Sequence, residues 1–239
     1  METSTYLLTQ IGFVIVTLVF YGLVLMQLKK GLTATGFSED RKRKIFLRTI
    51  IALIVWMAFI SILSLKGFFS DFSIFPPKLA IVLIVPLVTV LTVTFSKTTR
   101  EILSHIPAQN IIRLQVFRVA VEILIWMLLI QNLLPMQMTF EGRNFDILAG
   151  LTGPVVAYLY ARKNLGKNAA IVWNILGLML LFNIVGVALL SLPTPFRVFT
   201  NEPASTIVAR FPIVWLPGFL VPLAYGLHFL SLRQLTLRK

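Results

Sequence analysis

Residues 6–27 read YLLTQIGFVIVTLVFYGLVLMQ, a run of 22 residues without a charged side chain, and this stretch decides the fold. A helix that crosses a hydrocarbon core of about 30 Å needs about 20 apolar residues. No basic segment precedes the run, and it is followed by Lys29 and Lys30 instead of a small-residue cleavage site. We therefore expect it to remain in the membrane as a helix and not to be removed as a signal peptide.

Six further apolar segments follow along the chain. Because an unpaired backbone group is costly in hydrocarbon, each of them is expected to be an α-helix. We predict an all-α integral membrane protein, a single transmembrane domain over residues 1–239. Its seven transmembrane helices are expected at about 6–28, 45–69, 79–97, 114–135, 146–163, 169–193 and 211–233.

The composition supports this class. The chain is 57% hydrophobic and only 13% charged, and its mean hydropathy is +0.88, which no soluble core requires. Cysteine is absent, so disulfides, thiolate metal sites and iron–sulfur clusters are excluded. The two histidines, His105 and His228, fall in a predicted loop and in the last helix, which does not suit a bis-histidine haem. We expect no cofactor and no metal.

The distribution of basic residues predicts the orientation. The chain has 22 Lys and Arg against 9 Asp and Glu. Seventeen of the 22 fall on one side when the loops are assigned alternately. The remaining five are Lys66, Lys78, Arg143, Arg197 and Arg210. Basic residues favour cytoplasmic loops, so we predict a multi-pass protein of the cell membrane with its N-terminus outside and its C-terminus in the cytoplasm. Without a soluble face to carry the basic residues, nucleic-acid binding is not expected.

Two pairs of segments indicate an internal repeat. LSLKGFFSDF from Leu63 matches LSLPTPFRVF from Leu190, and FPPKLAIVLIVPL from Phe75 matches FPIVWLPGFLVPL from Phe211, which aligns Pro86 with Pro222. Both pairs lie at equivalent places in the first three and the last three helices. Seven helices therefore allow two parallel three-helix repeats joined by the fourth helix.

This organisation resembles that of the SWEET and PQ-loop transporters, and the resemblance implies transport of a small solute. The resemblance lies only in the arrangement of the helices. The Pro-Gln signature of that family is absent, because Gln10 in the first helix follows Thr9, so no residue role carries over.

Charged residues inside the membrane are costly and are functional candidates. Arg118 and Glu122 lie four residues apart, on one face of the fourth helix. They either form a structural ion pair with each other, or Glu122 is a proton or cation site that Arg118 tunes, with Arg118 also able to bind an anionic group of a substrate. Asn174 and His228, in the sixth and seventh helices, lie at about the same depth as Arg118.

The fifth predicted helix is short and contains Gly150, Gly153 and Pro154. A helix broken by Gly or Pro is typical of a transporter binding site, whereas close helix packing and a kink explain the same residues without a ligand. The polar segment before this helix predicts either an N-terminal cap by Asp146 or an outer gate. The gate would contain Arg143, Asn144 and Asp146, with Arg197, Glu202 and Arg210 opposite.

Our first hypothesis is a transporter or channel for a small solute or an ion, with a polar site on helices 4, 6 and 7. One alternative is a structural, assembly or receptor-like protein without transport; another is an intramembrane enzyme using Glu122 and His228. A retinal protein is rejected because the last helix has no mid-membrane lysine, and the motifs of eukaryotic heptahelical receptors are missing. The expected partners are the lipid bilayer and a small molecule or ion, and a homo-oligomer is compatible with the sequence.

Overall fold

The computed structural model describes residues 2–237, and side chains from residue 4 onward. These residues contain helices and no strand, which confirms the all-α prediction. The α-helices are α1 (Glu2–Ala34), α2 (Glu39–Leu65), α3 (Ala80–Phe95), α4 (Lys97–Ser104), α5 (Ala108–Arg113), α6 (Phe117–Ile130), α7 (Ile147–Ala161), α8 (Lys167–Leu190) and α9 (Val221–Thr236). Short 3₁₀ turns are η1 (Phe68–Ser70), η2 (Leu114–Val116), η3 (Met136–Met138) and η4 (Ser205–Ala209), and η5 (Leu216–Leu220) is a π-helix.

Each of the seven predicted segments is helical over most of its length. The fourth is formed by α5, η2 and α6, which follow one another without a gap, so it begins at Ala108, six residues before the predicted start at residue 114. The separate helix α4 precedes this segment. The seventh segment is formed by η5 and α9.

Several of these helices are long and apolar enough to span a membrane. Ser4–Ala34, Glu39–Leu65 and Lys167–Leu190 qualify alone, and α3 with α4 adds a fourth if the pair, bent by 66°, is one span. The others are shorter. At 1.5 Å per residue the 15 residues of α7 extend about 22 Å, less than a core of about 30 Å. Length and hydropathy thus support a membrane protein with three to four candidate spans among the described residues.

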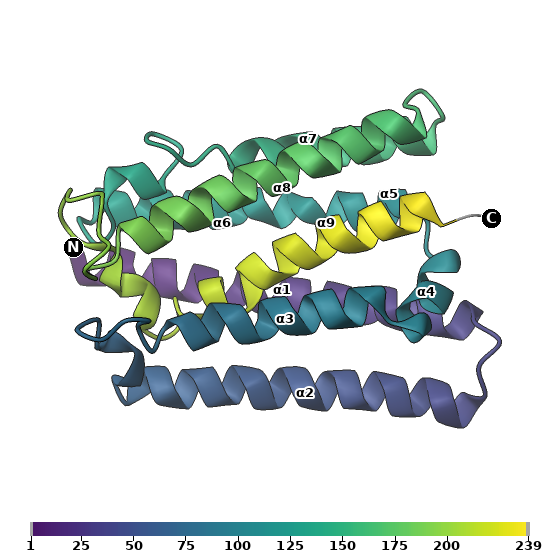
Figure 1. Cartoon of the computed structure of the whole chain (residues 1–239), viewed down its shortest axis with the longest axis horizontal. Helices are drawn as coiled ribbons and strands as arrows, with labels where there is room; N and C mark the ends of the chain where they lie inside the picture. The colour runs from purple at the N-terminus through teal and green to yellow at the C-terminus, as the bar shows by residue number, and fades with distance from the viewer. Residues whose placement is uncertain (1, 238–239) are drawn as a thin grey trace.

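The long helices run side by side along one axis (Figure 1). The N-terminus, the α2–α3 and α6–α7 connections and the segment between α8 and α9 lie at one end, which we call the N-terminal end of the bundle. The α1–α2 turn, α4, the α7–α8 turn and the C-terminus lie at the opposite, C-terminal end. The two ends of the chain are thus on opposite sides of the bundle.

Helix α9 occupies the middle of the packing. It contacts α3, α5 and α8, while α6 packs against α1 and α7. Helix α2 lies at the edge and leaves Ile54, Val55 and Leu65 exposed, the last by 70%. Exposed apolar side chains of this kind along a whole helix are expected where lipid, not water, surrounds the protein.

The start of the last helix is irregular, and the irregularity shapes the interior. Pro222 has no N–H to donate to the carbonyl of Gly218, four residues earlier. The indole Nε1 of Trp56, in α2, donates to this carbonyl instead, at 2.9 Å. The π-helix η5 is therefore held from outside, and it places Leu216 and Leu220 at the inner surface described next.

Candidate functional site

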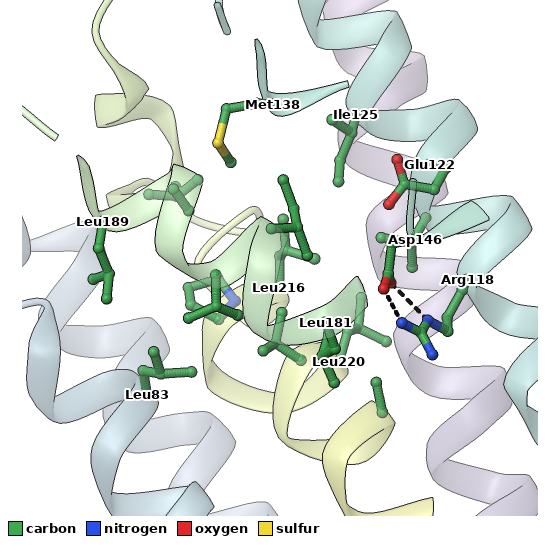
Figure 2. A pocket seen from close by; sticks show the side chains of 18 of the residues that line it. Leu83, Arg118, Glu122, Ile125, Met138, Asp146, Leu181, Leu189, Leu216 and Leu220 are labelled. Atoms are coloured by element: carbon green, nitrogen blue, oxygen red, sulfur yellow. Dashed lines mark hydrogen bonds and ion pairs between the residues drawn. The ribbon is translucent and has the colours of Figure 1, made fainter. Parts of the chain in front are cut away.

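A cavity of about 110 Å³ lies among α3, α6, α8 and the junction of η5 with α9. Its wall is apolar except for Arg118, Glu122 and Asp146. Figure 2 shows these three on one side, with Leu83 of α3 and Leu189 of α8 on the other. Leu189 is 46% exposed, so the wall reaches the surface of the bundle at α8. The cavity thus has an apolar body and one polar end.

Arg118 makes an ion pair with Asp146, which precedes α7. Its Nε donates to Asp146 Oδ2 at 2.6 Å, and its Nη2 donates to Asp146 Oδ1 (Figure 2). Both side chains are buried. Of the two alternatives for Arg118 and Glu122, the ion pair between them is not formed among the described side chains, because the planar guanidinium finds a two-point match in a carboxylate 28 residues away.

The same guanidinium also binds His228 in α9. Arg118 Nη1 lies 2.8 Å from His228 Nε2, and His228 Nδ1 lies 3.0 Å from Asn174 Oδ1 in α8. An arginine can only donate, so Nε2 must accept and Nδ1 must carry the ring proton. Asn174 Nδ2 in turn donates to Ser231 Oγ at 3.1 Å and to the Ala170 carbonyl at 2.8 Å. His228 is therefore a neutral imidazole in a hydrogen-bonded chain.

Glu122 is held differently. Asn144 Nδ2 lies 2.8 Å and 2.7 Å from the two Glu122 carboxylate oxygens, and Asn144 Oδ1 accepts the backbone N–H of Asp146 at 3.0 Å. Glu122 is buried. Among the side chains that the structure describes, no Lys or Arg forms an ion pair with it. A neutral amide is thus its polar partner.

The structure brings together six of the predicted site residues. Arg118 and Glu122 come from α6, Asn144 and Asp146 from the α6–α7 connection, and Asn174 and His228 from α8 and α9. Asn144 and Asp146 are buried, whereas the sequence left open an outer gate or, for Asp146, an N-terminal cap; the Asp146 side chain makes no capping hydrogen bond. The sequence reasoning missed Ser231, for which the only signal was its place one turn after His228.

The glycines of α7 pack against another helix instead of lining the cavity. A Cβ on Gly150 would lie 2.8 Å from the Val119 backbone nitrogen, and one on Gly153 would lie 3.3 Å from Gln115 Cβ. Helix α7 is continuous from Ile147 to Ala161 and contains Pro154. Of the two alternatives left open by the sequence, these contacts agree with close helix packing, since α7 packs against α5 and α6 and is not interrupted at the proline.

Arg143 faces away from the cavity. Its guanidinium carbon lies 5.0 Å from the centre of the Phe199 ring, and its carbonyl accepts from Asn183 Nδ2 at 2.7 Å. Arg197 pairs with Glu202 at 2.9 Å, and this hydrogen bond lowers the pKa of Glu202. Surface polar groups thus gather at the N-terminal end, separate from the buried site.

The pairing needed for the enzymatic hypothesis is not seen among the described residues. Glu122 is hydrogen-bonded to Asn144, and His228 to Arg118 and Asn174. An acid and a base that act together on one substrate lie within hydrogen-bond reach of the proton they exchange. Glu122 and His228 therefore have separate hydrogen-bond partners.

Comparison with known proteins gives one match. A family model described as "Domain of unknown function (DUF8737)" matches residues 74–236, which include α3 to α9 and every element that lines the cavity. No curated protein and no solved structure matches the chain.

Proposed function

This chain belongs to the DUF8737 family, and we propose that it is a seven-span membrane protein that binds a small solute in the cavity beside Glu122 and carries it through the membrane. In this proposal the N-terminus is outside and the C-terminus is in the cytoplasm. The whole of α3 to α9, and therefore the site, belongs to the family domain.

The observation that supports the proposal is a cavity that reaches both Arg118 and Glu122. A protein that used these charges only to hold its helices together would enclose them in a fully packed interface. Here the charged side chains form one end of an open space with an apolar wall. Small-molecule sites have this character, with a few polar groups that orient a ligand and mostly apolar contacts that bind it.

The arrangement of the helices agrees with seven crossings. Within residues 2–237 the helices group into seven segments when α4 is counted with α3 and when α5, η2 and α6 are counted as one, and the two termini lie at opposite ends of the bundle (Figure 1). The basic connections, such as residues 35–44 and 162–167, lie at the C-terminal end. Placing that end in the cytoplasm satisfies the positive-inside rule.

The proposal is tested by binding and then by flux. The purified chain is heated with a panel of small solutes that have an apolar body and one polar group. We expect at least one of them to raise the unfolding temperature, since a ligand that binds only the folded state stabilises it. Solutes that do so are then loaded into proteoliposomes, and their release is expected to be faster than from protein-free vesicles.

A pair of variants in α8 shows where the solute binds. Ala188 lines the cavity, and Val172 is an exposed residue of the same helix. Ala188→Phe should abolish the stabilisation, while Val172→Phe should retain it. If no solute stabilises the chain, or if Ala188→Phe responds like the unmodified protein, the cavity is not the site.

A further inference from the structure

The charges around the cavity do not balance. Arg118 is neutralised by its two-point pair with Asp146, and His228 is neutral because its Nε2 accepts from Arg118. Glu122 has only the amide of Asn144 as a polar partner. With Glu122 ionised, the site carries one negative charge in excess.

Within the part of the chain that the structure describes, no neighbouring element supplies a cation for Glu122. The wall opposite Glu122 consists of apolar residues of α3, α8, η5 and α9, such as Leu83, Leu181 and Leu220. The only basic group in the wall is Arg118, which already has its partner. An ionised carboxylate in such surroundings is costly unless a positive charge joins it.

We propose that the solute is a small organic cation whose ammonium group pairs with Glu122 and whose apolar body fills the rest of the cavity. This inference rests on the proposed function. A metal ion suits the site less well, because hard cations take about six oxygen ligands and no group of three His, Asp or Glu side chains within residues 4–237 is arranged to hold one. The apolar wall instead fits hydrocarbon.

The volume limits the size of the ligand. An engineered cavity of about 150 Å³ lined by Leu, Ile and Phe holds one benzene molecule. The cavity here, at about 110 Å³, is of the same order. The solute is therefore one aromatic ring or a short chain that carries an amine.

Three probes with the same body and different charges test the inference. They are 4-fluorobenzylamine, 4-fluorobenzyl alcohol and 4-fluorobenzoate, titrated by fluorine NMR into the full chain at neutral pH. We expect the amine to bind most tightly, the alcohol less tightly and the benzoate least. In Glu122→Gln the amine should lose at least about tenfold in affinity, because its ion pair is removed. The alcohol should bind as before and so show that the variant is folded.

Glu101→Gln is the matched control, since Glu101 is an exposed carboxylate of α4. It should bind all three probes as the unmodified chain does. Equal binding of amine and alcohol, unchanged in Glu122→Gln, would overturn the inference and show that Glu122 holds a proton. Tightest binding of the benzoate would overturn it in favour of an anion at Arg118. If none of the probes binds, or if Ala188→Phe binds them unchanged, the proposed function itself fails.

Discussion

Arg118 connects three segments of the chain with one planar side chain. It donates to Asp146 before α7 and to His228 in α9 while it belongs to α6. Placing a guanidinium in hydrocarbon is tolerated only when such partners are present. Because Asp146 and His228 are buried too, the Asp146 carboxylate and His228 Nε2 both depend on Arg118 as a hydrogen-bond donor. The residue is therefore as important for stability as for any ligand.

Replacing Arg118 should destabilise the fold strongly. Arg118→Met leaves Asp146 as a buried, unpaired carboxylate, and removal of one partner from such a pair costs roughly 3 to 5 kcal/mol. Arg113→Met, at an exposed position in α5, is the control. Unfolding temperatures of the two purified variants should differ clearly. Equal temperatures would mean that the ion pair contributes little.

At the surface, Asp71 provides a pH-dependent contact. Hydrogen bonds from Ser73 and from Lys78 lower the pKa of Asp71 from 3.8 to about 2. These bonds favour the ionised carboxylate, so their contribution to stability is complete above the usual pKa and is lost as the pH falls through about 2.

The Ser73→Ala variant should raise the pKa of Asp71, because the largest of these contributions is removed. The chain contains three aspartates, so carbon NMR of aspartate-labelled protein resolves the titration, with Asp71→Asn to assign the signal. An unchanged titration midpoint in Ser73→Ala would show that the hydroxyl does not donate to Asp71.

The sequence identified the charges of the site but not all of their partners. Arg118 and Glu122 are conspicuous because they interrupt an apolar segment, and their spacing indicates a shared helix face. Asp146 is the first residue of the fifth predicted helix, and a residue at a helix terminus is usually expected at the surface. Its pairing with Arg118 depends on how the α6–α7 connection folds back into the bundle, and no local pattern encodes that path.

At the scale of elements, α8 and α9 meet through one glycine. A Cβ on Gly177 would lie 2.6 Å from His228 Nε2. The imidazole cannot move away easily, because Arg118 and Asn174 bind its two nitrogens. The absence of a side chain at Gly177 thus sets the distance between the two helices.

Gly177→Ala is therefore expected to destabilise the protein by about 1 to 3 kcal/mol through overpacking. Gly186, in the same helix, has open space where its Cβ would be, so Gly186→Ala provides a control with the same chemical change. Denaturation of both variants in detergent measures the difference. A Gly177→Ala variant as stable as Gly186→Ala would show that α8 and α9 separate without cost.

The positions of the helices were largely predictable, since uninterrupted apolar runs of this length form helices in lipid. Their regularity was not. Gly150, Gly153 and Pro154 were compatible with either a broken or a closely packed helix, and α7 is continuous. In contrast, the π-helix η5 depends on Pro222 together with a hydrogen bond from Trp56 in a distant helix. Such support comes from tertiary packing, which periodicity does not reveal.

At the scale of the whole molecule, the number of membrane crossings can be counted by finding on which side of the membrane each connection between helices lies. The chain has no cysteine, so single cysteines can be introduced without removing any. With the N-terminus outside, cysteines at Ser73 and Asn201 should react with a membrane-impermeant maleimide on intact cells. Those at Ser38 and Asn164 should react only after permeabilisation. These four positions lie in four different connections.

Asn132, in the α6–α7 connection, and Ser104, the last residue of α4, complete the assignment. Cysteine at Asn132 should label from outside and cysteine at Ser104 only from inside. Two successive connections that label from the same side would show that the helix between them does not cross, and the seven-span proposal would then be wrong.

The central claim is that the cavity beside Glu122 admits a solute, and the reactivity of one cysteine tests it most directly. Ala188→Cys lines the cavity, whereas Met179→Cys lies on the same helix at a 61% exposed position outside the cavity wall, where we expect lipid. A small cationic methanethiosulfonate should modify Ala188→Cys and leave Met179→Cys unmodified, and 4-fluorobenzylamine should slow the reaction. An Ala188→Cys variant as unreactive as Met179→Cys would contradict the account.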